Sequence, residues 1–554
     1  MKNLVLVLSL AILSISCKSQ SETAVFVNNA PVVQDHPKLV VGIVVDQMRY
    51  DYLTRFYNKY SEGGFKLLMN EGFNCKNNHY NYTPTYTGPG HASIYTGTTP
   101  KYHGVIANNW YDKALGKSVY CAGDDTVSSV GTKHDAGHMS PRRMLTTSFA
   151  DENRLYTQMR GKTIGISMKD RGAVLPAGHT ANAAYWFHGE DEGRWITSSF
   201  YRNELPEWVA NFNASDAAES YLTTWNTLYD ISTYTESGSD LNTFEGGFKG
   251  KETATFPYDL KALSKDNKGF DILKATAYGN NLTTDFAIAA LDGEQLGQDE
   301  FTDVLTLSYS STDYVGHNFG VNSKEVEDTY IRLDKDIERF IQALDAKVGK
   351  GQYTLFLTSD HGAVEVPSYL QSVDIPAGYV DNKARKEKLH AFMTKRFGAS
   401  DLIESISNDQ IFLNREKLAL LNLDLETVQK QIVHEVITYP NIDKAYTATA
   451  MGSTSFTTGI EELVQNGFSQ KRSGDVLIVN DPSYLSYSKT GSSHGSGLNY
   501  DTHVPLLFYG KGIAAGSTLQ KTRIVDIAPT ISALLGISFP NGAIGMPLEF
   551  VFDK

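Results

Sequence analysis

Three aspartates and three histidines lie along the 554-residue chain at spacings that suit metal binding. They are Asp46, Asp313, His317, Asp360, His361 and His494. Asp313 and His317 are four residues apart, so one helical turn or loop can bring both to a single metal ion. Carboxylate oxygens and imidazole nitrogens are the ligands expected for zinc in hydrolytic sites. The six residues together predict a metal centre with hydrolytic chemistry.

A loop rich in threonine, glycine and proline offers a hydroxyl group for such chemistry. It runs from Asn81 to Ile94, and Thr87 lies in it where a helix can begin. Free backbone N–H groups and the positive end of a helix dipole stabilise an oxyanion or a phosphate at such a place. Many loops of this composition are only turns. The prediction of a catalytic loop therefore depends on the aspartates and histidines elsewhere in the chain.

Each candidate ligand also has a purely structural interpretation. An aspartate at a strand end often caps the next helix, and an Asp-His-Gly sequence is often a turn. Four further histidines, His103, His134, His138 and His503, compete as ligands but are weaker candidates. The hydrolytic interpretation is favoured because the six residues are all expected at one edge of a sheet.

Apolar runs rich in valine, isoleucine and leucine precede most of these residues. They cover residues 38–45, 162–167, 304–309, 353–359 and 504–509. Continuous runs of this length are typical of strands buried on both faces of a parallel sheet. Ligands bind outside the carboxyl ends of such strands, and that is where the polar candidates gather.

Helical patterns alternate with these strands. Apolar residues follow helical spacing from Val326 to Leu344, with Asn322 or Ser323 available as a cap, and a second helix is expected over 526–536. Alternating strands and helices predict an α/β fold, with a doubly wound, mostly parallel central sheet and helices on both faces.

The composition describes an ordinary globular protein with 41% hydrophobic residues and a net charge of −13. An acidic chain without clustered lysine and arginine argues against nucleic-acid binding. A phosphate-bearing substrate remains compatible with this acidic composition, because a bound metal ion can reverse the electrostatic field at the binding site.

The N-terminus has the pattern of a signal peptide, residues 1–17. Met1, Lys2 and Asn3 precede an apolar run from Leu4 to Ile15, and this run is too short to span a bilayer. Cys17 directly after it resembles a bacterial lipoprotein site, although Ser14 departs from the usual leucine, and ordinary signal cleavage is the alternative. Either interpretation predicts export, to the periplasm or to an outer-membrane lipid anchor at Cys17.

Residues 18–37 are expected to form a flexible tether and residues 38–554 a single catalytic domain. Two stretches near 172–275 and 365–490 interrupt the strand and helix alternation, and we interpret both as cap insertions. Cys75 and Cys121 are compatible with one disulfide or with two buried thiols.

The ordered motifs resemble those of the alkaline phosphatase superfamily of two-metal hydrolases. They are Asp46, Thr87, Asp313–His317, Ser359–Gly362 and Ser493–Gly495. Further segments resemble the bacterial phosphate-insensitive alkaline phosphatases of the PafA type. These are Val44–Arg49, Ser167–Arg171 and Leu175–His179. The likeness extends from about residue 38 to the end of the chain.

This resemblance implies two zinc ions per chain and an alkaline-phosphatase-like fold. Asp46, Asp360 and His361 would hold the first ion, with Thr87 as a further ligand, and Asp313, His317 and His494 would hold the second. Whether a magnesium or calcium ion adds to the zinc stays open. We expect a monomer.

The resemblance also implies four catalytic residues. Thr87 would be the nucleophile and form a phosphothreonine, and Asn108 would donate to a phosphoryl oxygen. Lys169 and Arg171 would contact the remaining nonbridging oxygens. A phosphate monoester is a dianion, whereas a diester has one charge fewer, so two cations favour monoesters. The expected function is phosphate scavenging from small organic monoesters.

Other members of the superfamily are the alternatives. A phosphodiesterase or nucleotide pyrophosphatase would keep the ligands and the threonine, but is not expected to have Lys169 and Arg171. A sulfatase needs a modified cysteine or serine, and a phosphoglycerate mutase of this superfamily needs a serine in the cytosol. The alternative without catalysis is a lipoprotein that binds metal or glycan on a decayed hydrolase fold.

Overall fold

The computed structural model describes residues 36–553 of the chain. The expected signal peptide, Cys17 and the expected tether up to residue 35 lie outside the described residues. Within residues 36–553, no helix combines the length and the apolar composition that crossing a membrane requires.

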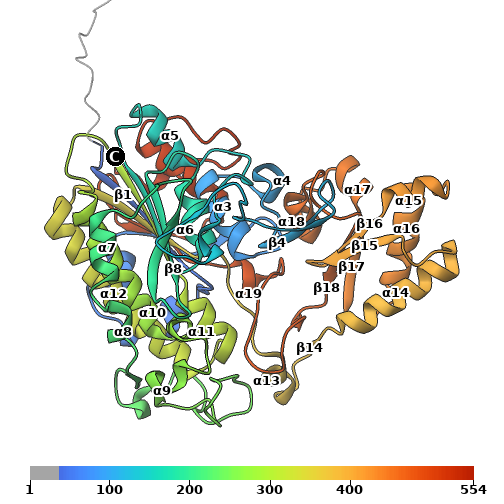
Figure 1. Cartoon of the computed structure of the whole chain (residues 1–554), viewed down its shortest axis with the longest axis horizontal. Helices are drawn as coiled ribbons and strands as arrows, with labels where there is room; N and C mark the ends of the chain where they lie inside the picture. The colour runs from blue at the N-terminus through green and yellow to red at the C-terminus, as the bar shows by residue number, and fades with distance from the viewer. Residues whose placement is uncertain (1–35, 554) are drawn as a thin grey trace, which may run out of the picture. The chain divides into compact units, whose positions relative to one another are not determined.

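A ten-stranded sheet forms the centre of the described chain (Figure 1). Its strands, in order, are β21 (Gly516–Thr518), β2 (Phe73–Cys75), β20 (Leu506–Gly510), β13 (Tyr353–Thr358), β1 (Leu39–Val45), β12 (Asp303–Tyr309), β7 (Thr163–Ser167), β8 (Ala183–His188), β9 (Arg194–Ser198) and β6 (Ser129–Val130). The five strands from β13 to β8 are parallel. The predicted α/β fold with a parallel sheet centre is confirmed, and antiparallel pairs flank that centre on both sides.

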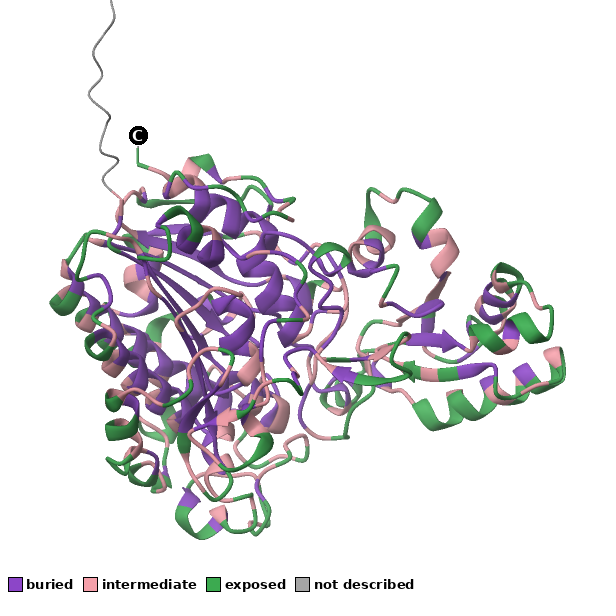
Figure 2. Ribbon diagram, turned by 45° about the horizontal axis from the view of Figure 1, so that its top comes forward, coloured by how far each residue is buried: buried purple, intermediate pink, exposed green. Residues whose placement is uncertain are grey.

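Helices cover both faces of this sheet. On one face Val41 and Val45 of β1 pack in the same cluster as α10 (Ala277–Gly293) and α12 (Lys324–Leu344). On the other face Val40 and Val44 pack with α3 (Thr87–Thr96) and α20 (Ile527–Leu534). Figure 2 shows the sheet almost entirely buried between the two layers. The alternation along β1 explains why the whole strand is apolar.

The predicted long helix and its cap are confirmed. The Ser323 hydroxyl accepts a hydrogen bond from the Val326 backbone N–H at 3.1 Å, at the start of α12. The expected C-terminal helix is α20, which ends shortly before Gly536, a residue with a positive φ of 61°. Such a φ favours glycine, because a Cβ is unfavourable there.

One strand runs opposite to the expected direction. The run at 504–509 was expected to belong to the parallel set, but β20 pairs antiparallel with β13, with Leu506 opposite Thr358. An apolar run carries no information on direction, since both kinds of strand are buried here. Because β20 begins at the edge where β13 ends, the loop before β20 still brings His494 to that edge.

The stretch 172–275 contributes β8 and β9 to the central sheet, in addition to helices such as α7 (Glu207–Asn213). Its aromatic residues Tyr185 and Phe187 lie in β8 and pack in the core.

The stretch 365–490 folds largely around a second, four-stranded sheet. Its strands, in order, are β15 (Ile403–Ser407), β16 (Gln410–Leu413), β18 (Val476–Asn480) and β17 (Ile442–Thr447). Helices α14 (Asn382–Phe397) and α16 (Leu425–Val436) share a core with this sheet. A further helix, α18 (Gly459–Gly467), meets the loop before Thr87, where the Thr83 N–H donates to the Leu463 carbonyl at 3.1 Å.

Candidate active site

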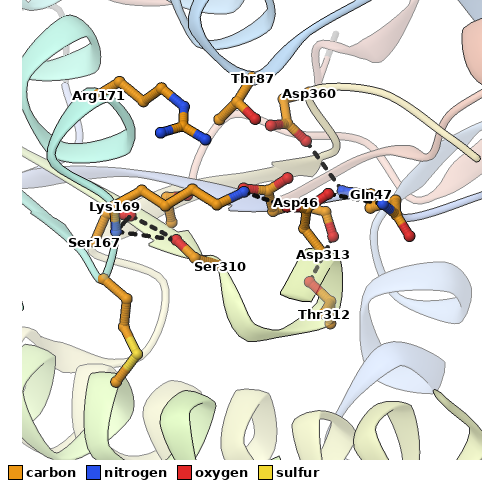
Figure 3. A network of polar contacts seen from close by, with 12 residues as sticks. Asp46, Gln47, Thr87, Ser167, Lys169, Arg171, Ser310, Thr312, Asp313 and Asp360 are labelled. Carbon is orange, nitrogen blue, oxygen red and sulfur yellow. Dashed lines mark hydrogen bonds and ion pairs between the residues drawn. The ribbon is translucent and has the colours of Figure 1, made fainter. Parts of the chain in front are cut away.

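The carboxyl ends of four parallel strands bring the candidate residues together. Asp46 follows β1, Lys169 follows β7, Asp360 follows β13, and Asp313 lies in α11 (Ser311–Phe319) after β12. β1 lies between β12 and β13, with Val45 opposite Tyr309 and Val44 opposite Thr358. This register places the three aspartates around one point, as Figure 3 shows.

One ammonium group lies among the three carboxylates. The Lys169 Nζ atom is 2.6 Å from Asp46 Oδ2 and 2.5 Å from Asp313 Oδ2. All three aspartates and Lys169 are buried. Burial opposes the charged form of the lysine, but Asp313 and Asp46 outweigh it and raise the pKa of Lys169.

The carboxylates have unequal surroundings. Burial, and then the charge of Asp313, raises the pKa of Asp46 to about 6. Burial and the charge of Asp46 raise the pKa of Asp360 as well. Burial also opposes ionisation of Asp313, but His317 and Lys169 outweigh it and lower the pKa of Asp313. Asp46 and Asp360 therefore have too little positive charge nearby to stabilise both carboxylates in their ionised form.

Two carboxylate oxygens are buried without a hydrogen-bond partner. They are Asp46 Oδ1 and Asp360 Oδ2. His361 Nε2 lies 3.4 Å from the first and 3.5 Å from the second, without a hydrogen bond to either. A buried carboxylate oxygen without a partner is costly unless a cation compensates it. These three atoms fit the ligand set of a divalent metal ion, and they form one of the two candidate groups in this part of the described chain.

The second candidate group contains Asp313, His361 and His494. The family resemblance instead implied Asp313, His317 and His494. His317 also lies beside Asp313, with its Nε2 atom 3.1 Å from Asp313 Oδ1. The His494 Nε2 atom is 3.7 Å from the same oxygen. His361 is common to both candidate groups, with its ring stacked on that of His494 at a centroid distance of 3.4 Å. The two groups are therefore adjacent.

The three histidines are oriented for metal binding. Each Nδ1 atom lies within hydrogen-bond distance of a backbone carbonyl: Gly362 at 3.0 Å for His361, Ser492 at 2.7 Å for His317 and Thr85 at 2.7 Å for His494. Donation from Nδ1 leaves the Nε2 lone pair free for a metal. Burial lowers the pKa of His361 and lowers that of His494 to about 3. Both rings are therefore neutral, which is the form that binds metal.

Thr87 is the first residue of α3 and is buried. Its Oγ1 atom lies 3.5 Å from His361 Nε2, beside both candidate groups. Gly90, one turn along α3, packs against Asp360, and a Cβ at Gly90 would collide with the Asp360 carbonyl oxygen. This close approach holds the nucleophile candidate next to the carboxylates.

Asn108 and Arg171 complete the surroundings of Thr87. The Asn108 Oδ1 atom accepts a hydrogen bond from the Gly88 N–H at 2.7 Å, so its amide NH₂ group is left to donate elsewhere. The Arg171 Nη1 atom donates to the Tyr120 hydroxyl at 3.1 Å, and its buried Nε atom has no partner. Figure 3 shows the Arg171 guanidinium, Lys169 and Thr87 directed toward the same space.

Two residues in this site had no predicted role. The Gln47 backbone N–H donates to Asp360 Oδ1 at 3.1 Å and its side chain donates to Asp313 Oδ1 at 2.7 Å. A Cβ at Gly316 would collide with the Gln47 side chain, so glycine between Asp313 and His317 makes room for it. His91 Nε2 lies 2.9 Å from Ser308 Oγ, and its Nδ1 atom is 3.4 Å from Asp360 Oδ2.

The positive φ of Gln47, 63°, is invisible in the sequence. Two signals in the sequence could have indicated a role for these residues. Gln47 directly follows Asp46 at the end of a strand, and His91 lies one helical turn after Thr87.

Other sequence candidates lie elsewhere. His103 Nε2 pairs with Ser93 Oγ at 2.9 Å, and the His503 ring stacks on Tyr50. Cys75 and Cys121 are free, buried thiols, so the alternative of one disulfide is excluded by the structure.

Comparison with known proteins places the chain in a family. Residues 40–504 match the family described as type I phosphodiesterase / nucleotide pyrophosphatase. Alkaline phosphatase PafA of Elizabethkingia meningoseptica is 45% identical over 94% of this chain and 95% of its own length. Alkaline phosphatase PhoV of Synechococcus elongatus is 42% identical over 98% of both chains. A protein of Myroides odoratus named calcium-transporting ATPase is 44% identical over 94% of this chain and 95% of its own length.

Solved structures agree with this grouping. The crystal structure of wild-type PafA has a TM-score of 0.90 and 45% identity, over 94% of this chain and 99% of that one. A PafA variant with one threonine, one asparagine, one lysine and one arginine replaced has the same TM-score at 44% identity, with the same coverage. The chain therefore belongs to the type I phosphodiesterase / nucleotide pyrophosphatase family. Within that family it is an enzyme of the PafA type of alkaline phosphatase, a phosphoric monoester hydrolase.

Proposed function

We propose that the chain is an exported, zinc-dependent phosphomonoesterase that scavenges phosphate from organic esters through a phosphothreonine at Thr87. The observation that carries this proposal is the position of the Thr87 hydroxyl, 3.5 Å from His361 Nε2 and beside both candidate metal groups. The PafA variant supports the assignment of the other residues. Its four replaced residue types are those of Thr87, Asn108, Lys169 and Arg171.

Zinc fits the nitrogen and oxygen donors of this site. Asp46, Asp360 and His361 would hold one ion, and Asp313, His317 and His494 the other. Imidazole nitrogen with carboxylate oxygen favours zinc over magnesium or calcium, which prefer oxygen alone. Bound zinc supplies Lewis acidity, which lowers the pKa of an oxygen nucleophile and stabilises charge on a leaving oxygen.

The chain would carry out two displacements at phosphorus. In the first, the Thr87 oxygen attacks and loses its proton, the bond from phosphorus to the ester oxygen breaks, and the alcohol leaves with that proton in net balance. In the second, water attacks phosphothreonine, the bond from phosphorus to the Thr87 oxygen breaks, one water proton restores the Thr87 hydroxyl, and hydrogen phosphate is released. The N-terminus of α3 and the amide of Asn108 would stabilise the nonbridging oxygens during both displacements.

Lys169 and Arg171 would set the substrate class. Lys169 is buried and Arg171 carries an unpartnered Nε atom in the space beside Thr87. Two cations stabilise a dianionic monoester more than a monoanionic diester, because charge-assisted hydrogen bonds strengthen with the charge of the acceptor.

The test compares hydrolysis of a monoester and a diester of one phenol by wild type, Lys169→Ala, Arg171→Ala and the double variant. Loss of both cations should lower kcat/KM for the monoester by several orders of magnitude, on the order of 10²-fold for each contact. Diester hydrolysis should change far less. Lys261→Ala is the control, because Lys261 is 73% exposed and contacts Glu219 away from the site.

The family is described by phosphodiesterase and nucleotide pyrophosphatase activity, so diester hydrolysis is the activity to compare with monoester hydrolysis. A wild type that prefers the diester, together with silent variants, would contradict the roles proposed for Lys169 and Arg171.

Export is part of the proposal and is supported by the signal-peptide pattern of residues 1–17. Cys17 would carry a lipid anchor. Cell fractionation of wild type and Cys17→Ser tests the anchor: the variant should move from the membrane fraction to the soluble fraction, and an unchanged distribution would refute lipidation.

A further inference from the structure

A third cluster of metal-ligand side chains lies outside the site described above. His134, His188 and Asp191 each offer one nitrogen or oxygen atom, and these atoms lie within 4.8 Å of one another. His188 ends β8, Asp191 follows in the turn before β9, and His134 follows β6. β7 and β12 separate β8 from β1. At about 4.8 Å for each step between strands, the cluster is about 14 Å from the strand that carries Asp46.

The spacing suits a tetrahedral ion. His134 Nε2 lies 3.4 Å from Asp191 Oδ1, and ligands at about 2.0 Å from a tetrahedral zinc are about 3.3 Å apart. The rings of His134 and His188 have a centroid distance of 4.8 Å. Glu192 Oε1 is 4.0 Å from His134 Nε2 and offers a fourth donor.

An unpartnered buried nitrogen points independently to a ligand. His188 is 8% exposed, and its Nε2 atom has no hydrogen-bond partner. A buried imidazole nitrogen without a partner loses free energy compared with one in water. Metal coordination would satisfy it, as hydrogen bonds satisfy the Nδ1 atoms in the active site.

The backbone that carries His134 is fixed by hydrogen bonds to its neighbours. The Trp186 Nε1–H donates to the Ala136 carbonyl at 2.9 Å, and the Ser129 hydroxyl donates to the His134 carbonyl at 2.5 Å. Two of the three residues, His134 and Asp191, line a hollow that opens to solvent, together with Glu190, Lys268 and Gly269. An ion can therefore enter without unfolding the edge of the sheet.

We propose that His134, His188 and Asp191 form a third metal site, for a borderline divalent cation such as Zn²⁺, separate from the phosphate chemistry. Two imidazoles and one carboxylate are a set that binds zinc, and three protein ligands leave a position for water or for Glu192. The ion would link the loop after β6 to the turn between β8 and β9.

The test counts zinc bound per chain, by equilibrium dialysis of the metal-free full-length enzyme with elemental analysis. Wild type should bind one zinc more than His134→Ala and than Asp191→Asn. Loss of one ligand should weaken this site by at least about 10-fold, since changes outside the direct ligands already weaken metal sites by that factor. Both substituted side chains are exposed, at 44% and 75%, so these variants should fold.

His138→Ala is the matched control, because His138 lies four residues along and has its closest acidic contact with Asp135, at 3.8 Å. It should keep the wild-type zinc count, and all three variants should keep wild-type phosphatase activity. Equal zinc counts in wild type, His134→Ala and Asp191→Asn would overturn the proposal. The test measures the difference in zinc count between wild type and the variants, which is one ion. This difference does not depend on whether the active site itself binds two zinc ions.

Discussion

Lys169 carries one positive charge against three buried carboxylates. Its ammonium reaches Asp46 and Asp313, while Asp360 Oδ2 has no partner. Apolar surroundings make such an excess of negative charge unfavourable. At the scale of single residues, metal cations bound by the three carboxylates would balance this negative charge. Lys169 would then also be able to contact the phosphoryl group of the substrate.

The first prediction concerns protons released on zinc binding. A carboxylate must be ionised to bind a metal, and the pKa of Asp46 in the metal-free chain is about 6. Below that pH the folded chain holds a proton on Asp46 that zinc must displace. Apparent zinc affinity should therefore fall as the pH drops below about 6.

Isothermal titration in buffers of different ionisation enthalpy measures this release. It should be larger just below pH 6 than about two units higher, and Asp46→Asn should reduce the difference. The same release at both pH values would show that Asp46 is already ionised.

The second prediction concerns Asn108, whose Oδ1 atom is held by the Gly88 N–H. Asn108→Ala should lower kcat/KM for a monoester by on the order of 10²-fold, the usual effect of losing one such donor. Asn108→Asp should lower it further, because the new carboxylate keeps the Gly88 contact but repels the phosphoryl dianion. Steady-state kinetics decide, and an aspartate variant as active as wild type would remove Asn108 from contact with substrate.

At the scale of elements, α3 positions Thr87 through a close contact with the loop after β13. Gly90 allows this contact because it has no Cβ, which would collide with the Asp360 carbonyl and lie 2.8 Å from the Asp360 Cβ atom. Every residue of α3 is buried, so the helix has little freedom to shift without disturbing its neighbours.

The third prediction follows from this packing. Gly90→Ala should move Thr87 away from Asp360 and lower kcat/KM by about 10²-fold, because displacements near 1 Å have that effect. Gly452→Ala is the control, since Gly452 also lies in a helix, α17 (Ala448–Ser453), but has open space around its Cβ position. Equal activity of the two variants would show that α3 tolerates the shift.

Elements with a strong local pattern could be predicted from the sequence. The apolar run at 38–45 and the helical spacing at 326–344 determine β1 and α12 because each is buried in a way that its own residues specify. The direction of β20 could not be predicted, since an apolar run is equally suited to either direction. The strands β8 and β9 were missed because their aromatic residues resemble those of an insertion.

The same distinction holds within the site. The six candidate ligands could be identified from residue types and order, and the structure places them at one sheet edge. The contacts of Gln47 depend on its positive φ and on tertiary packing against Gly316, which no local pattern encodes.

At the scale of the whole molecule, the site gathers residues from segments as distant in sequence as Asp46 and His494. Their side chains meet only when the central sheet is complete, so metal binding at these candidate groups would be linked to folding of the chain. An ion that binds the folded chain alone stabilises it, by about 3 kcal/mol at a concentration 100-fold above Kd.

The fourth prediction is therefore a loss of stability on chelation. Metal removal should lower the Tm of the chain by several degrees, and added zinc should restore it more effectively than magnesium or calcium, because three ligands are imidazoles. Calorimetry of His134→Ala measures the change in Tm on chelation in a chain that lacks the proposed third metal site. A Tm that does not respond to chelation would contradict the metal assignment.

The measurement that tests the central claim most directly is the stereochemical course at phosphorus. A monoester made chiral with oxygen isotopes is hydrolysed in isotopically labelled water, and the configuration of the phosphate is determined. Each in-line displacement inverts phosphorus, so transfer to Thr87 and then to water predicts overall retention. Overall inversion would mean that water attacks the ester directly, and the phosphothreonine at Thr87 would be ruled out.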